Sequence, residues 1–220
     1  MHNPTFPEWM FLLAGVRWTI ALSIIGVVLG GVMGFVISLA RTSERFGFLR
    51  TITATYIGIF QGTPLLLQLF VTYYGLALIG FNITAWVSVA VCFTLYASAF
   101  LGEIWRGSID AIPRGQTEAA TALGVSYWVR MRKIILPQAL RISLPATVGF
   151  LVQLIKGTSL AAIVGFTELT RSGTIVANQT FTPLLVFGAV GIVYFCLCWP
   201  LSIYGSRLEA RLAVSDSSNR

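Results

Sequence analysis

The residue types that most enzymes use for chemistry are scarce in this chain. It has one histidine, His2, and eight acidic residues that never cluster. Membrane metalloproteases and phosphotransferases need several His, Asp or Glu side chains at fixed spacing, and the sequence has no HExxH, GxSxG or paired-aspartate pattern. It also has no GxxxxGK[ST] loop, which an ATPase needs to hold the phosphates of ATP. We therefore expect no catalysis, no bound metal ion and no ATP hydrolysis by this chain.

The three cysteines, Cys92, Cys196 and Cys198, all lie within apolar runs. The last two are two positions apart, which fits neither a redox CxxC pair nor a zinc knuckle, so we expect buried, inert thiols. The first 17 residues lack a basic stretch followed by a short apolar run, and no cleavable signal peptide is predicted.

Composition indicates a membrane protein. Hydrophobic residues make up 56% of the 220 residues, and charged residues only 10%. Soluble domains contain about 25% charged residues, and a core of this size cannot keep so much apolar surface from water, so lipid must cover part of it. The formal net charge of +7 does not indicate a nucleic-acid partner, because the basic residues lie between apolar runs.

A helix needs about 20 apolar residues to cross the hydrocarbon layer. The sequence predicts about five such spans, near residues 18–40, 55–79, 84–105, 144–166 and 184–206, with a turn at 80–82 between the second and the third. Continuous apolar runs favour helices over a β-barrel, so the predicted fold class is an all-α membrane protein. The predicted domain order is a periplasmic N-terminal segment at 1–15, a membrane domain at 16–208 and a cytoplasmic tail at 209–220.

Basic residues predict the orientation. Arg17 and Arg171 fall on one side of this five-span arrangement, and twelve of the 15 Lys and Arg residues fall on the other. Cytoplasmic loops are enriched in Lys and Arg, so we expect the N-terminus outside and the C-terminus inside. The twelve are Arg41, Arg45, Arg50, Arg106, Arg114, Arg130, Arg132, Lys133, Arg141, Arg207, Arg211 and Arg220.

The loop at 106–141 is the one extended polar segment. Between Pro113 and Pro137 lie roughly 20 residues with good helix formers, which predict a short amphipathic helix. Its apolar stripe would consist of Ala120, Leu123, Tyr127 and Met131. By pattern alone such a helix has two uses: it lies at the headgroup level, or it docks into a groove of a soluble partner.

The residues of this loop resemble a known motif. Glu118-Ala-Ala-Thr-Ala-Leu-Gly124 is followed, after eleven residues, by Leu136-Pro137. This is similar to the EAA motif of binding-protein-dependent ABC importer permeases, in which the motif forms a coupling helix seated in a cleft of the ATPase subunit. The resemblance implies a type I ABC transmembrane fold with a cytoplasmic coupling helix. The implied coupling residues are Glu118, Ala119, Ala120, Leu123, Gly124 and Tyr127.

The resemblance covers most of the chain and is greatest to the polar amino acid branch, the histidine/glutamine permease type. Four segments carry it: 61–70 (QGTPLLLQLF), 99–116 (AFLGEIWRGSIDAIPRGQ), 156–160 (KGTSL) and 168–171 (ELTR). One residue departs from the pattern, because Gln61 stands where arginine is usual. The change removes a positive charge from the cytoplasmic half of the second span.

Polar residues within the spans are candidates for the transport path, since ionisable groups in a membrane usually face the bundle interior or a wet cavity. Lys156 could form an ion pair inside the bundle, contact substrate or snorkel to the interface. Glu103 could contribute to the path or pair locally with Arg106. The remaining candidates are Gln61, Gln68, Gln153, Thr158 and Ser159. Instead of lining the path, the glutamines could form hydrogen bonds between helices. Thr158 and Ser159 follow Gly157, and this small-residue segment could loosen the helix beside a cavity or allow close helix packing.

Glu168 and Arg171 are expected at the outer end of the fourth span. They could contact a docked binding protein, or form a solvated surface pair.

Together the resemblance and the topology predict one permease subunit of an ABC importer for polar amino acids in a bacterial inner membrane. The implied partners are a cytoplasmic ATPase dimer that holds ATP and Mg, a second permease subunit, a periplasmic solute-binding protein, the amino acid and membrane lipid. The alternatives are a permease for another small solute, or a secondary transporter or channel without an ATPase. A secondary transporter usually has paired repeats, and no internal repeat is visible. The amino acid, and the choice between homodimer and heterodimer, stay open.

Overall fold

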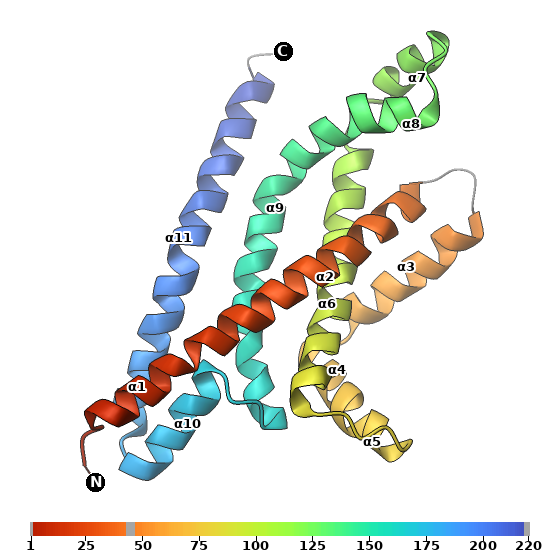
Figure 1. Cartoon of the computed structure of the whole chain (residues 1–220). Helices are drawn as coiled ribbons and strands as arrows, with labels where there is room; N and C mark the ends of the chain where they lie inside the picture. Colours follow the sequence, from red (N-terminus) through yellow and green to blue (C-terminus); the bar gives the residue numbers. More distant parts are fainter. Residues whose placement is uncertain (1, 43–46, 218–220) are drawn as a thin grey trace.

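A computed structural model describes residues 2–42 and 47–217, and within these residues the chain is helical and has no β-strand (Figure 1). Short π-helices at Val71–Gly75 and Met131–Ile135 and a 3₁₀ segment at Thr158–Val164 join longer helices. The α-helices are α1 (Phe6–Ala14), α2 (Val16–Thr42), α3 (Gly47–Gly62), α4 (Leu65–Phe70), α5 (Leu76–Leu78), α6 (Ala85–Asp110), α7 (Arg114–Ala122), α8 (Tyr127–Arg130), α9 (Leu136–Gly157), α10 (Leu169–Thr180) and α11 (Pro183–Ser217).

Helices α2 and α6 form the most extensive helix pair of the fold. Without a hydrophobic force between helices in lipid, close packing depends on small residues. The buried face of α2 has this composition at four-residue spacing: Leu22, Gly26, Gly30, Gly34 and Ser38. Its opposite face carries aliphatic side chains that are more than half exposed and suit contact with lipid: Ile24, Val28, Val32 and Val36.

The two larger apolar clusters join most of the spanning helices. The larger lies where α2, α4, α6 and α9 meet and is centred on Leu69, Phe93 and Leu154, all fully buried. The second joins α1, α10 and α11 through Leu12, Leu169 and Val186. The helix α1, which lies in the N-terminal segment, is therefore part of the packed fold.

Four helices or helix runs are long and apolar enough to cross a membrane: Phe6–Thr42, Ala85–Asp110, Tyr127–Val164 and Pro183–Leu212. They coincide, within two residues at the ends, with the first, third, fourth and fifth predicted spans or extend beyond them. The predicted second span, near residues 55–79, is not one straight helix. It consists of Gly47–Gly62 and Leu65–Leu78, bent by 105°.

The break in the second span has a local cause. Pro64 has no backbone N–H and disfavours a helical conformation at the residue before it. Pro64 itself is extended, with ψ 135°, at the N-cap of α4. The predicted turn at 80–82 is present, and Gly80 adopts a positive φ of 91° there.

The two termini lie at opposite ends of the molecule. Figure 1 shows α7, α8 and the C-terminus at one end, and α1, α5 and α10 at the other. Most of the twelve basic residues therefore lie toward the end that carries α7; Arg45 and Arg220 lie outside the described residues. Cys92 and Cys198 are buried as expected, but Cys196 is exposed, because it lies on an outward face of α11.

Candidate functional site

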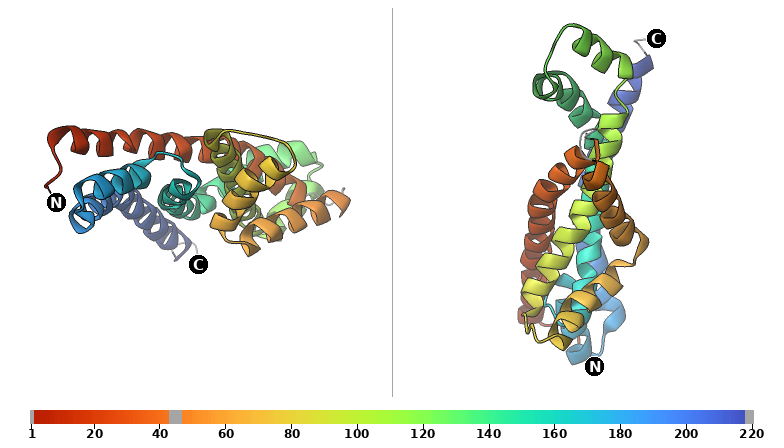
Figure 2. Two further views of the ribbon diagram at one scale, coloured as in Figure 1. Left: turned by 90° about the horizontal axis from the view of Figure 1, so that it is seen from below. Right: turned by 90° about the vertical axis from the view of Figure 1, so that its right-hand side faces the viewer.

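The segment with the EAA-like motif forms a hairpin at one end of the molecule. Figure 2 (right) shows α7 and α8 as a lobe beyond the spanning helices, at the end that holds the C-terminus. Helix α7 begins after Pro113, which is extended at the N-cap, with ψ 130°. It ends at Ala122, because Gly124 of the motif turns the chain there.

Gly124 ends α7 through a Schellman motif. Its φ is +69°, a left-handed conformation that glycine adopts without a steric penalty. The Val125 N–H donates to the Ala120 carbonyl at 3.0 Å, and the Gly124 N–H donates to the Thr121 carbonyl at 2.9 Å. These two bonds satisfy carbonyls that the helix end would leave unpaired. The six-residue spacing from Glu118 to Gly124 thus places the motif's glycine at the turn.

The predicted single helix of roughly 20 residues is wrong, because this turn divides it into α7 and α8. Its predicted apolar stripe is also divided. Ala120 and Met131 are 4% and 7% exposed, whereas Leu123 and Tyr127 are 82% and 38% exposed. The hairpin is closed by Arg130, whose Nη1 donates to Thr121 Oγ1 at 2.6 Å and whose guanidinium lies 5.6 Å from the ring centroid of Tyr127.

The six predicted coupling residues fall on two sides of this hairpin. Glu118, Ala119, Leu123 and Gly124 are exposed, and Tyr127 is partly so, whereas Ala120 faces the interior. Trp128, which the sequence reasoning missed, adds an exposed aromatic side chain, 72% exposed, to the same hairpin. A small, largely apolar surface with one carboxylate is suited to docking in a groove of another protein.

A charged cluster lies where α6 approaches this end. Arg106 donates to Glu103 through both Nε, at 2.9 Å, and Nη2, at 2.5 Å, as the three-residue spacing predicts. Arg106 also pairs with Asp110, and Arg41 on α2 lies 3.9 Å from Glu103. Arg106 binds both oxygens of Glu103, and the pair with Arg41 connects α6 to α2. The contact with Arg41 could not be predicted from the spacing of residues in the sequence.

Gln68 and Gln61 lie near the break between α3 and α4. The Gln68 side chain is 9% exposed, and its Nε2 donates to the Phe60 carbonyl at 2.8 Å and to the Thr63 carbonyl at 3.0 Å. These bonds satisfy backbone groups that the bend releases. Gln61 is exposed and lies outside this network. The Gln68 side chain is therefore buried and stabilises the bend, and it does not line an open surface.

The candidate path residues of the fourth span lie together at the end of α9 that is remote from α7. Gln153 and Lys156 are exposed, and Gln153 Nε2 donates to the Tyr96 hydroxyl of α6 at 3.1 Å. Within the described residues Lys156 forms no ion pair, in contrast to the bundle-interior pair considered from the sequence. Thr158 is buried and Ser159 partly exposed, and the chain changes there from α-helix to 3₁₀-helix.

Glu168 does not lie on a surface, so the expected contact with a binding protein is wrong for this residue, as is the solvated surface pair with Arg171. The Glu168 side chain is fully buried at the N-cap of α10. It accepts from the Thr170 N–H at 2.8 Å, the Arg171 N–H at 2.9 Å and the Tyr194 hydroxyl at 2.9 Å. The unpaired N–H groups of a helix start favour such a carboxylate. Arg171 remains partly exposed.

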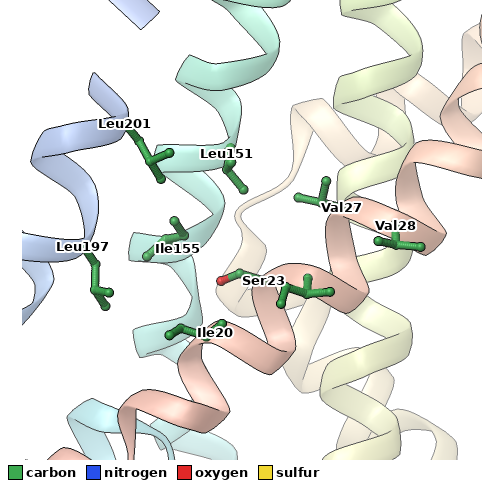
Figure 3. Close-up of a pocket in the computed structure, with 9 residues that line it drawn as sticks. Ile20, Ser23, Val27, Val28, Leu151, Ile155, Leu197 and Leu201 are labelled. Carbon is green, nitrogen blue, oxygen red and sulfur yellow. The ribbon is translucent and has the colours of Figure 1, made fainter. Parts of the chain in front are cut away.

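An apolar cavity of about 340 Å³ lies between α2, α9 and α11 (Figure 3). Its described lining is aliphatic apart from Ser23, and the Ser23 hydroxyl donates to the Thr19 carbonyl of its own helix at 2.8 Å. The lining offers no charge to pair with an ammonium or carboxylate group. This cavity is therefore unsuited to a polar amino acid.

The fold and the exposed hairpin define a class, the transmembrane domains of ABC importers. A solved structure described as "Crystal structure of an amino acid ABC transporter with histidines" matches with a TM-score of 0.85 and 30% sequence identity, over 96% of this chain and 100% of that chain.

Sequence comparison then gives the family. Its profile, described as "Binding-protein-dependent transport system inner membrane component", matches residues 26–214. The "Probable amino-acid ABC transporter permease protein YckA" of Bacillus subtilis (strain 168) is 35% identical over 203 residues, 92% of this chain and 89% of the relative. The "Arginine transport system permease protein ArtQ" of the same organism is 34% identical over 215 residues, 97% of this chain and 98% of the relative. The chain belongs to the family of inner-membrane components of binding-protein-dependent transport systems.

Proposed function

We propose that this chain is a permease subunit of an ATP-driven importer that carries polar amino acids across a bacterial inner membrane. The observation that carries the proposal is the exposed hairpin of α7 and α8, with Glu118, Leu123 and Trp128 on its surface. Energy would come from a cytoplasmic ATPase dimer that holds ATP and Mg, and the hairpin would pass its movement to the spanning helices.

The proposed orientation places this hairpin and the C-terminus in the cytoplasm and the N-terminus outside. The distribution of Lys and Arg supports it, since the end that carries α7 is rich in basic residues. A periplasmic solute-binding protein would then dock at the opposite end, where Arg171 is partly exposed. Glu168 has no part in that contact.

A second permease, identical or related, would complete the path. A single copy leaves Gln153 and Lys156 of α9 exposed, although polar and ionisable groups in a membrane usually face a partner or a wet cavity. The transport path would therefore lie along this side of α9, at the junction of two permeases, rather than in the apolar cavity of Figure 3.

Amino acids are the proposed cargo because relatives of this chain are described as permeases for arginine and L-cystine. Lys156 offers an ammonium group that suits an α-carboxylate, and Gln153 offers a neutral hydrogen-bonding group. Neither feature selects one side chain, and the binding protein would set most of the specificity.

Reconstitution in proteoliposomes tests the proposal. The chain is assembled with an ATPase, a second permease and a binding protein encoded with it, and uptake of a labelled amino acid mixture is measured with and without ATP. We expect uptake only in the complete assembly with ATP, and none with this chain alone. Mass spectrometry of the ligand that co-purifies with the binding protein then identifies the cargo.

Uptake by this chain alone would support the secondary transporter or channel and overturn the proposal. ATP-dependent uptake of a different small solute, with no amino acid transported, would leave the importer class intact and overturn the substrate.

A further inference from the structure

Two glutamine side chains connect the hairpin to the fourth span. Gln116 lies in the first turn of α7 and Gln138 in the first turn of α9. Gln116 Nε2 donates to Gln138 Oε1 at 3.0 Å, and Gln138 Nε2 donates back to Gln116 Oε1 at 2.6 Å. Two reciprocal bonds fix both the distance and the relative orientation of the amide planes. Gln138 Nε2 also donates to the Ile134 carbonyl at 2.7 Å, which holds that side chain against its own helix.

An apolar cluster supports the base of the hairpin next to this pair. It joins the end of α6 and the linker before α7 to the π-helix Met131–Ile135 and the start of α9. Its five buried side chains are Ile109, Ile112, Met131, Ile135 and Ala139. These contacts hold α6 to α9, but they include no residue of α7 itself.

Helix α7 lies between two breaks in the helical chain. Pro113 interrupts the helix on one side, and Gly124 turns the chain on the other. The Arg130–Thr121 bond ties α7 to α8, and the glutamine pair ties it to α9. Both contacts reach the helix run Tyr127–Val164, because Arg130 lies near its start and Gln138 lies further along it. The glutamine pair reaches α9 itself. The exposed end of α7, with Glu118 and Leu123, lies beyond it.

We propose that the Gln116–Gln138 amide pair is a positioning joint that makes α7 and α9 move as one body. A displacement of the exposed end of α7 then reaches α9, which carries Lys156 in its last turn. This inference rests on the proposed function, because the displacement is the one that an ATPase partner would impose. Gln116 and Gln138 contact neither ATP nor cargo.

The first test compares transport with ATP hydrolysis in the complete assembly. We expect Gln116→Leu and Gln138→Leu each to lower the amount of amino acid imported per ATP hydrolysed by about tenfold, because each removes both bonds of the pair. ATP hydrolysis and co-purification of the ATPase should persist. The double variant Gln116→Glu/Gln138→Lys replaces the amide pair with a charge-assisted pair and should restore most of the ratio. The matched control is Gln179→Leu, an exposed glutamine of α10 at the opposite end.

A distance measurement tests the joint without relying on the cargo. Spin labels are placed at the exposed residues Arg114 and Leu140, in a background with Cys196→Ser, and read by pulsed EPR with and without vanadate-trapped nucleotide. We expect an unchanged distance in the otherwise native chain, and a nucleotide-dependent shift in the Gln116→Leu variant.

An unchanged import-to-ATP ratio in both leucine variants would overturn the joint, as would a failure of the Glu/Lys pair to restore it. A shift of equal size in the native chain and in Gln116→Leu would overturn it as well. An assembly that hydrolyses ATP but imports no amino acid would instead overturn the proposed substrate. The distance measurement would then still show whether the Gln116–Gln138 pair holds α7 to α9.

Discussion

The hydroxyl of Tyr194 on α11 donates a hydrogen bond of 2.9 Å to the buried carboxylate of Glu168, at the start of α10. The same carboxylate accepts the N–H groups of Thr170 and Arg171, and the Thr19 hydroxyl of α2 lies 3.4 Å from it. One side chain thus joins three helices at the end of the molecule that is remote from the hairpin.

Loss of this carboxylate should destabilise the protein. Glu168→Ala removes the N-cap and leaves buried donors unpaired, which should cost about 2–4 kcal/mol. Glu168→Gln keeps one acceptor oxygen and should cost less, and Tyr194→Phe should cost least. Thermal unfolding of the detergent-purified variants measures the order. Equal stability of Glu168→Ala and the native chain would contradict the structural role.

The stability should also depend on pH through Glu168. Burial raises the pKa of this carboxyl, and the hydrogen bonds from Thr170, Arg171 and Tyr194 oppose the rise only in part. The folded protein then holds the proton more tightly than the unfolded chain does. The contribution of this group is complete below the ordinary carboxyl pKa and is lost as pH rises through the raised pKa. Unfolding temperatures measured from acidic to neutral pH should show this loss in the native chain, and a flatter profile in Glu168→Gln.

Two neighbouring glycines of α2 should respond differently to alanine. A Cβ at Gly30 would lie 2.6 Å from the Ala97 Cβ and 2.9 Å from the Thr94 carbonyl oxygen of α6, so the helices would have to separate. We expect Gly30→Ala to destabilise the protein by about 1–3 kcal/mol. A Cβ at Gly31 has its nearest atom at 3.5 Å, on Trp105. Gly31→Ala should therefore change the unfolding temperature little. Similar decreases in the unfolding temperature of both variants would show that the distance between α2 and α6 does not determine the loss of stability.

Gly124 should be required for coupling. Valine there must adopt a φ of +69°, at a cost of roughly 1–2 kcal/mol, which would favour a rearranged hairpin. We expect Gly124→Val to retain ATP hydrolysis in the complete assembly and to lose most amino acid uptake. Gly58→Ala is the matched control, because a Cβ there has open space and the helix φ is ordinary. Full uptake by Gly124→Val would count against the coupling role of the hairpin.

Lys156 should contribute to uptake but not to membrane insertion. If its ammonium contacts the cargo or the second permease, Lys156→Ala should lower uptake about tenfold or more, and Lys156→Arg should lower it less. The control is Lys133→Ala, an exposed lysine outside the predicted span at 144–166. Membrane-fraction abundance and initial uptake rates are measured together. Unchanged uptake in Lys156→Ala would remove this residue from the path.

The sequence determined the class of this protein because lipid imposes a strong constraint on composition. Long uncharged runs must form helices in a membrane, so the all-α fold could be read from hydropathy. The spacing from Glu118 to Gly124 located the segment of the motif, although the turn at Gly124, where φ is positive, divides it into two helices. Two further signals were present but unused: Pro64, which marks the broken span, and the four-residue spacing of Gly26, Gly30 and Gly34, which marks the α2–α6 contact.

The tertiary structure decided which polar residues are buried and which pair across the fold. Glu168 was expected at the surface because it falls at the outer end of the fourth predicted span, but it is buried and one of its hydrogen bonds comes from Tyr194, 26 positions away. The Gln116–Gln138 pair is separated by 22 positions, and no local pattern relates them. Hydrogen bonds and burial depend on groups that folding brings together from distant segments. For that reason the sequence located the segment that forms the hairpin, and the tertiary structure revealed the hydrogen bonds that tie it to α9.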